Sequence, residues 1–203
     1  MTHSAALRML ASHITTVLVI ALGLSACSPP ESVTATWTED VQLANGQIIE
    51  VEHKQVSNTV GQWGQGIEYA LSYVTLRPRS GGTWLTAEWF GLVRPLVLDL
   101  DASTNEFVIV GIPGQCQVYQ ALGAPDSYYV EFRFREGKWQ LVPLSTFSVG
   151  HASNLLLSVR PSTETGHVSV EDKRTRDSGP APQLIRSIGL NGRNPCNGKP
   201  LKQ

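Results

Sequence analysis

Beyond residue 33 the chain is divided into short runs in which apolar and polar residues alternate, and turn-forming residues separate the runs. The clearest run is Tyr128–Arg135, where one set of alternate positions is entirely aromatic or aliphatic and the other set carries one glutamate and two arginines. Successive side chains of a strand point to opposite faces of a sheet, so this pattern predicts a strand with one buried face. Runs of this kind, with turns about every eight to twelve residues, are typical of all-β folds. The sequence therefore predicts a mainly β chain, either an antiparallel sandwich or a small barrel.

Two hairpins are predicted from their turns. Thr34–Leu43 and Gln47–His53 flank Asn45-Gly46, and an Asn-Gly pair between two alternating runs is the strongest short-range hairpin signal. Glu136-Gly137 turns the run at Tyr128–Arg135 onto Lys138–Leu144 in the same way. Each of these two turns therefore joins a pair of neighbouring antiparallel strands.

The remaining strands and helices are predicted from shorter signals. Pro95 lies inside one predicted strand and indicates an edge position or a bulge, because proline cannot donate to a ladder. One or two short helices are expected near the C-terminus. The helix candidates are Gln117–Leu122 and Ala181–Ile188, while Glu171–Asp177 fits a helix or a solvated loop equally well. The further predicted strands are Glu68–Arg77, Trp84–Phe90, Leu92–Leu100, Glu106–Val110, Leu155–Val159 and His167–Val170.

The N-terminal segment has the three regions of a secretory signal. Met1–Arg8 carries one positive charge, Met9–Leu24 is largely apolar, and small residues precede Cys27. Leu24-Ser25-Ala26-Cys27 resembles the lipobox of bacterial lipoproteins. This resemblance implies cleavage before Cys27, a diacylglycerol on its thiol and an acylated amino group. Ser28 rather than Asp follows Cys27, and the same resemblance then implies export to the outer membrane, facing the periplasm.

Two other interpretations of this segment stay open. An uncleaved anchor helix needs about 20 apolar residues, whereas Met9–Leu24 is 16 residues long and contains polar side chains. Secretion without a lipid is the stronger rival. The predicted organisation is a lipoprotein signal peptide at 1–26, a tether at 27–33, a β-rich domain at 34–190 and an irregular C-terminal tail at 191–203.

The charge balance bears on partners. A chain of 203 residues with a formal net charge of −1 lacks the basic excess of a nucleic-acid-binding protein. Residues 27–130 contain 11 acidic and 4 basic residues, and residues 131–203 contain 6 acidic and 11 basic ones. These charges either pair across the sheets or leave a basic face for an anionic membrane surface. That face would consist of Lys173, Arg174, Arg176, Arg186, Arg193, Lys199 and Lys202.

Three cysteines are present, and two remain when Cys27 carries the lipid. In an oxidising compartment Cys116 and Cys196 are expected to form a disulfide. The alternative is that Cys116 is a nucleophile served by His151, which a second thiol would oppose. His53, His151 and His167 show no ligand spacing, so neither a metal ion nor a cofactor is expected.

No common catalytic motif occurs in the sequence, and the candidate binding residues are few. Asp99 and Asp101 project from the same face of a strand, where they could bind calcium or share a proton, or could simply form the following turn. Trp63 lies among glycines in a predicted loop and could stack on a ligand. Glu39 and Asp40 form a second carboxylate pair.

Three stretches, at 37–46, 95–99 and 137–140, resemble uncharacterised proteobacterial envelope proteins, and the resemblance rests on hairpin turns and strand aromatics. It carries no activity over. The leading hypothesis is a membrane-anchored envelope lipoprotein with a non-enzymatic binding or structural role, whose sheet edge or loops contact another envelope protein. The alternative is a binder of a small lipid or glycan, or an unrecognised hydrolase, with a pocket near Trp63, Asp99 or His151.

Overall fold

The structure is a computed structural model that describes residues 32–61, 67–156, 166–177, 188 and 192–201, with the backbone alone described at 59–61, 67–72 and 176–177. The predicted signal peptide with Cys27 lies outside these ranges, as does Trp63. The predicted helix Ala181–Ile188 also lies outside them, except for its last residue. None of the helices in the described ranges is long and apolar enough to cross a membrane.

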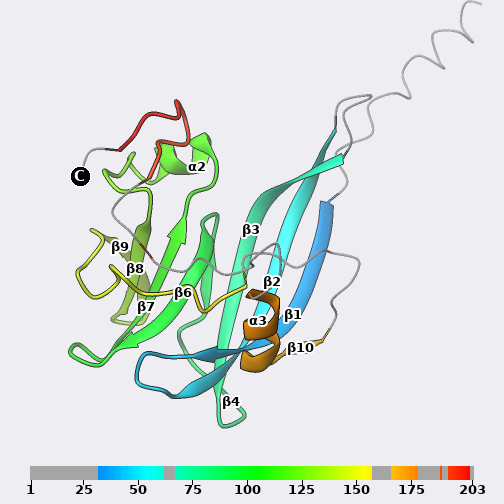
Figure 1. Ribbon diagram of the computed structural model, residues 1–203, viewed down its shortest axis with the longest axis vertical. Coiled ribbons are helices and arrows are strands. Elements are labelled where there is room, and N and C mark those ends of the chain that lie inside the picture. Colours follow the sequence, from blue (N-terminus) through cyan, green and yellow to red (C-terminus); the bar gives the residue numbers. More distant parts are fainter. Residues whose placement is uncertain (1–31, 62–66, 157–165, 178–187, 189–191, 202–203) are drawn as a thin grey trace, which may run out of the picture. The chain divides into compact units, whose positions relative to one another are not determined.

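The first sheet has six strands in the order β10-β1-β2-β3-β4, with β5 also paired to β3 (Figure 1). All of its pairs are antiparallel except β1 with β10, which is parallel. Long β1, β2 and β3 make up most of this sheet, and the other three strands are short. The strands are β1 Ser32–Gln42, β2 Ile48–Gly61, β3 Ile67–Ser80, β4 Thr83–Trp84, β5 Trp89–Gly91 and β10 His167–Val168.

The second sheet is antiparallel, with four strands in the order β6-β7-β8-β9. Pro95 lies on the edge strand β6, and the β6–β7 register shifts between Pro95 and Val97. The edge position and the bulge predicted for this proline are therefore both present. The strands are β6 Arg94–Asp101, β7 Glu106–Ile112, β8 Val130–Arg135 and β9 Lys138–Val142.

The two sheets pack face to face around one apolar cluster. Val51 and Leu76 of the first sheet and Leu98, Ile109 and Val130 of the second belong to it. Both sheets are open, so the predicted sandwich is the architecture found, rather than the small barrel.

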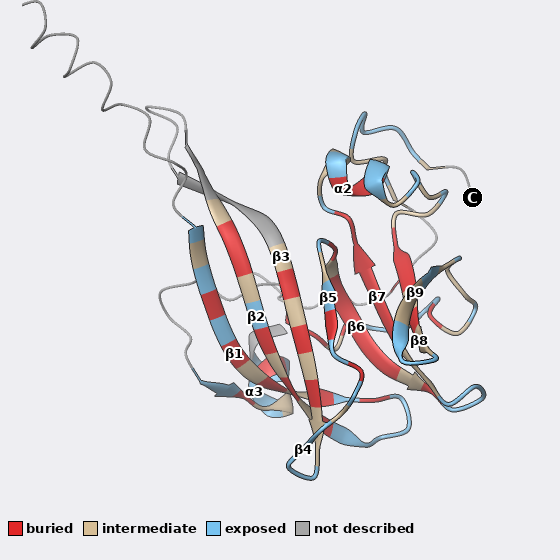
Figure 2. Cartoon of the chain, turned by 180° about the vertical axis from the view of Figure 1, so that it is seen from behind, coloured by how far each residue is buried: buried red, intermediate tan, exposed pale blue. Residues whose placement is uncertain are grey.

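The second sheet is also covered on its far face. Val108 and Val110 of β7 pack there against Tyr129, Ile188 and Phe147. Buried residues consequently run almost continuously along β6 and β7, whereas they alternate with less buried ones along β1 (Figure 2). Several polar residues on this face of the second sheet, Asp101, Glu131 and Arg133 among them, are therefore removed from water.

Both predicted hairpins are confirmed. Gly46 has a φ of 85° in the turn between β1 and β2, which a residue with a side chain rarely adopts. Glu136 and Gly137 both have positive φ, at 53° and 76°, between β8 and β9. Two successive positive φ values are those of a type I′ turn, whose twist matches that of the flanking strands.

Two strand predictions were wrong. Trp84–Phe90 is not one strand, because its two ends pair separately with β3 as β4 and β5. Leu155 and Leu156, the described residues of the predicted strand Leu155–Val159, lie in no strand. The backbone N–H of Leu155 donates to Leu96 of β6, and that of Leu156 donates to the Glu39 carboxylate of β1. This segment therefore connects the two sheets instead of extending either one.

Within the described ranges there are two short helices, α2 Cys116–Ala121 and α3 Val170–Asp177. The helix α2 matches the one predicted at Gln117–Leu122, and α3 covers Glu171–Asp177, for which a helix and a loop were equally expected. The predicted disulfide is present: Cys116, the first residue of α2, is bonded to Cys196 across 80 residues of sequence. The bond holds the C-terminal segment, in which Arg193 forms an isolated bridge with Pro200, against α2.

Candidate binding site

A buried carboxylate, Glu39, lies on the inner face of β1 and is fully enclosed. The residues on either side of it in the strand pattern, Trp37 and Val41, are core residues. Nε2 of His53, on the paired strand β2, lies 2.7 Å from its Oε1, and the His53 ring stacks on Trp37 at 4.5 Å. The backbone N–H of Leu156 donates to Oε2 at 3.1 Å.

Lys173 of α3 supplies the positive charge for this carboxylate. Its ammonium pairs with Oε2 of Glu39 and donates to the carbonyl oxygens of Asp40 at 2.6 Å and Asn154 at 2.7 Å. All three of its protons are thus used, and the residue is only 4 % exposed. Lys173 therefore cannot belong to the predicted basic face, and that assignment was wrong.

For Glu39 and for Lys173, burial and electrostatic attraction shift the pKa in opposite directions. Burial alone would raise the pKa of the Glu39 carboxyl, but the electrostatic attraction of His53 and Lys173 outweighs it and lowers the pKa from 4.5 to about 2. Burial likewise lowers the pKa of the Lys173 ammonium, against the attraction of Glu39. The cluster of Glu39, His53 and Lys173 holds α3 against β1.

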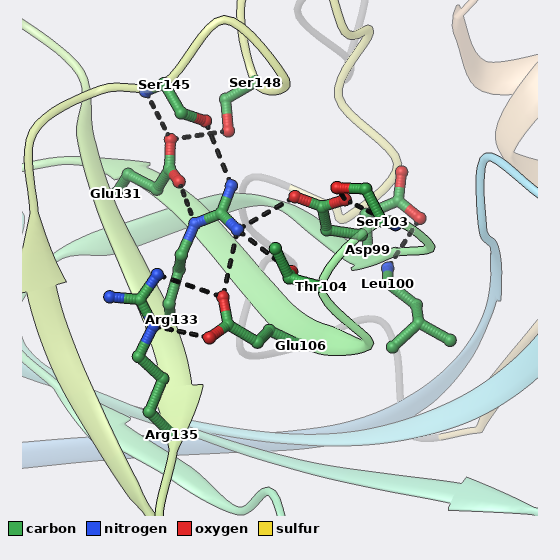
Figure 3. A network of polar contacts seen from close by, with 11 residues as sticks. Asp99, Leu100, Ser103, Thr104, Glu106, Glu131, Arg133, Arg135, Ser145 and Ser148 are labelled. Carbon is green, nitrogen blue, oxygen red and sulfur yellow. Dashed lines mark hydrogen bonds and ion pairs between the residues drawn. The ribbon is translucent and has the colours of Figure 1, made fainter.

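A second buried network lies on the far face of the second sheet, around Arg133 of β8 (Figure 3). Its guanidinium donates to Glu131 at 2.7 Å, to Asp101 at 2.8 Å and to Glu106 at 3.0 Å. The other carboxylate oxygen of Glu131 accepts from the backbone of Ser145 and the hydroxyl of Ser148. The network attaches the 145–148 segment to the sheet.

Asp101 has its partners in this network. The hydroxyl and the backbone N–H of Ser103 both donate to its Oδ1, so the turn-forming interpretation is correct. The hydrogen bond from the Ser103 side chain is the main reason that the pKa of Asp101 falls from 3.8 to about 2, with burial opposing it and Arg133 adding to it. Both of its oxygens are therefore used within the protein.

Asp99 has different surroundings, although it lies only two residues away on β6. Its Oδ1 accepts the backbone N–H groups of Ala44 at 2.9 Å and Leu100 at 2.8 Å. Within the described ranges no hydrogen bond reaches its Oδ2, and Nε2 of His151 lies 3.9 Å from that oxygen. The side chain is nevertheless only 4 % exposed. The structure thus separates the two predicted aspartates and brings Asp99 to His151.

Asp99 and His151 line a pocket of about 500 Å³. Asn154 forms part of its wall and connects the sheets: its amide N–H groups donate to Gln42 of β1 and Leu98 of β6, at 3.1 and 2.9 Å. The 43–46 turn, the 151–154 segment and α3 complete the wall. The lining residues are Asp40, Gln42, Leu43, Ala44, Gly46, Asp99, His151, Ala152, Ser153, Asn154, Val170, Lys173 and Arg174.

The imidazole of His151 is held in place from one side. The Phe147 ring meets it edge-on at 4.7 Å, and Nδ1 is buried with no hydrogen-bond partner in the described part of the chain. A proton on Nδ1 would be a buried donor without an acceptor, so the ring proton is better placed on Nε2, towards Asp99. The alternative in which His151 serves Cys116 is excluded, because that thiol is in the disulfide.

In the parts of the chain that are described, no three histidine, cysteine or acidic side chains are grouped so that they could hold a metal ion. No protein-family model matches the chain, no curated protein matches its sequence, and no solved structure matches it.

Acid is expected to destabilise the fold through Glu39 and Asp101. Both carboxyls have a lower pKa in the folded chain than their ordinary values of 4.5 and 3.8, so unfolding takes up protons as the pH falls. Their contribution is complete above pH 4.5 and is lost between that pH and about 2. Urea unfolding at a series of pH values would measure this loss. A free energy of unfolding that stays constant over this interval would contradict it.

Proposed function

We propose that this chain is a lipid-anchored protein of the bacterial envelope that binds a small molecule in the pocket at Asp99 and His151. The observation that carries the proposal is the free Oδ2 of Asp99, an oxygen of a nearly fully buried carboxylate that faces a pocket large enough for a small molecule. Buried charged groups are normally paired, so an unpaired one in a pocket favours a ligand. The lipobox supports the anchor and the envelope location.

Binding is favoured over hydrolysis by the state of the hydroxyl in the pocket. The single hydroxyl proton of Ser153 has two backbone acceptors within reach, the carbonyl oxygens of Leu96 at 2.8 Å and Leu155 at 3.1 Å. A serine nucleophile needs its proton directed at a base, and this one is directed at the backbone. The role of Asp99 and His151 is accordingly to hold a ligand.

Filling the pocket tests the proposal. Ala152 is exposed on the pocket wall, so Ala152→Trp adds bulk there without entering the core. The full-length chain, purified from cells in mild detergent, is expected to release a small molecule on denaturation, detected by mass spectrometry, and the variant is expected to lose it. Ala102→Trp, at an exposed turn position outside the pocket, is the matched control. Equal small-molecule content in all three proteins would refute the proposal.

Lipid anchoring has its own test. With Cys27→Ala the chain has no thiol to acylate, so we expect it to leave the membrane fraction, whereas Cys116→Ala is expected to leave membrane association unchanged. Cell fractionation and intact-mass measurement of the two variants would check this. A Cys27→Ala protein that remains in the membranes would show that another segment anchors the chain.

A protein partner at a sheet edge is the second candidate function. The β6 edge is blocked, because the 153–155 segment donates three hydrogen bonds to the carbonyl of Leu96. In the described ranges no strand pairs with the outer edge of β9, where Leu141 is 44 % exposed. An extended segment of another envelope protein could add there. Crosslinking in intact cells, with Leu141→Lys as the disrupting variant, would capture a stoichiometric partner or exclude this edge.

A further inference from the structure

We infer that the ligand of the pocket is a small organic cation, with a protonated amine that binds Oδ2 of Asp99. This inference rests on the proposed function and specifies the chemistry of its ligand. It follows from three features of the pocket: the fixed orientation of one carboxylate, the engagement of the neighbouring lysine and arginine with other groups, and the aliphatic residues in the wall beside it.

The orientation of the Asp99 carboxylate is fixed by the backbone. Two N–H groups, from Ala44 and Leu100, hold its Oδ1, and these come from the β1–β2 turn and from β6 itself. The remaining oxygen is on the pocket side, 3.9 Å from Nε2 of His151, which is beyond hydrogen-bond distance. A carboxylate held in this way is a preorganised acceptor for one donor group.

Neither the lysine nor the arginine of the described lining pairs with this carboxylate, and its nearest titratable neighbour is His151, whose Nε2 lies 3.9 Å from Oδ2. Lys173 uses its three protons on Glu39, Asp40 and Asn154. Arg174 is 64 % exposed, and its guanidinium contacts Glu171 and Gln42 at 3.5 Å. A hydroxyl ligand would satisfy the hydrogen bond of Oδ2 but would leave its charge uncompensated. An ammonium group supplies both a hydrogen-bond donor and a compensating positive charge.

The rest of the wall fits the body of such a ligand. Leu43, Ala44, Ala152 and Val170 line the pocket with aliphatic side chains. A compact apolar amine could place its ammonium at Asp99 and its hydrocarbon part against these residues. The Nε2–H group of His151 could then donate one further hydrogen bond, which would favour ligands with an acceptor beside the amine.

Two probes of nearly equal shape distinguish the effect of the ligand's charge on affinity from the effect of its shape. Benzylamine carries the ammonium, and benzyl alcohol replaces it with a hydroxyl. Titrations of the full-length chain in detergent micelles, followed by the amide resonances of residues 151–154, are expected to show benzylamine binding at least about tenfold more tightly than benzyl alcohol. The alcohol reports on the pocket and the difference between the probes reports on the charge.

Asp99→Asn removes the charge and keeps the shape. Its amide oxygen can still accept from Ala44 and Leu100, so we expect the variant to fold, with a thermal midpoint as the check. The affinity for benzylamine is expected to fall about tenfold or more, to that of the alcohol, while the affinity for the alcohol stays the same. Asp126→Asn makes the same exchange at an exposed position outside the pocket and is expected to change neither affinity.

The outcomes distinguish this inference from the proposed function. If both probes bind equally to the wild type, or if Asp99→Asn binds benzylamine as well as the wild type does, the cationic ligand is refuted and the binding pocket stands. If neither probe shifts the pocket resonances at millimolar concentration, the cationic ligand is refuted as well. The pocket itself then depends on the co-purification experiment with Ala152→Trp.

Discussion

Replacing Glu39 with glutamine is expected to lower the free energy of unfolding by about 3 to 5 kcal/mol, because removing one partner of a buried ion pair leaves the other uncompensated. Glutamine keeps an oxygen that can accept from Leu156. An amide oxygen in the place of Oε2 can still accept from the Lys173 ammonium, but it carries no negative charge, and the NH2 group in the place of Oε1 then faces Nε2 of His53. The ammonium is then a buried charge with only neutral oxygens as partners, among them the carbonyls of Asp40 and Asn154.

Urea unfolding of the Glu39→Gln chain measures the effect, and two comparisons identify its cause. Glu52→Gln makes the same exchange on β2, where the carboxylate pairs with Arg77 and both side chains are about a third exposed. Exposed pairs contribute about 1 kcal/mol or less, so this control is expected to stay close to the wild type. A Glu39→Gln chain as stable as the control would contradict the role given to the cluster.

A double variant separates charge from packing. In Glu39→Gln with Lys173→Met both charges are gone, and methionine retains most of the apolar length of the lysine side chain. Pairs of buried charges can be replaced by apolar groups at little cost, so the double variant is expected to be more stable than Glu39→Gln alone. If the two substitutions simply add, the loss comes from packing and not from the uncompensated ammonium.

Much of the fold could be predicted because the sequence signals for strands and hairpins depend only on residues close together in the chain. Alternation over Tyr128–Arg135 and the Asn45-Gly46 turn depend on neighbouring residues only, and the strands and hairpins they predict are present. The expectation that β8 has only one buried face was wrong, because Glu131 and Arg133 on its charged face are buried as well. The prediction of a single strand at Trp84–Phe90 was wrong because the two ends of this segment pair separately with β3, which the order of apolar residues does not reveal. The prediction of a strand at Leu155 and Leu156 was wrong because an apolar run that connects two sheets has the same composition as a buried strand.

The binding site could be predicted only in part. Asp99 and His151 were candidates by residue type, and the structure brings them together across 52 positions of sequence. The Glu39 cluster was missed, although one signal was present: Glu39 lies between Trp37 and Val41 on the apolar face of its strand. An acid in that position must be paired in the fold. That its partner is Lys173, 134 residues away, depends on tertiary structure alone.

Arg133→Met is the second substitution expected to destabilise the chain strongly, again by about 3 to 5 kcal/mol. The guanidinium is the common donor to three carboxylates, and Glu131 among them is fully buried. Glu106 retains the charge of Arg135, whereas Asp101 and Glu131 retain only hydrogen bonds from serines, and of these two carboxylates Glu131 is the more deeply buried. Lysine is not a sufficient replacement, because a single ammonium cannot reach acceptors that the planar guanidinium meets from several sides.

The control for this experiment lies two residues further along the same strand. Arg135 pairs with Glu106 alone and is 39 % exposed, so Arg135→Met is expected to cost about 1 kcal/mol or less in the same urea unfolding measurement. If Arg133→Met costs no more than Arg135→Met, then Arg133 stabilises the sheet by packing its aliphatic stem, and the 145–148 segment is held by its apolar contacts instead of by this charge.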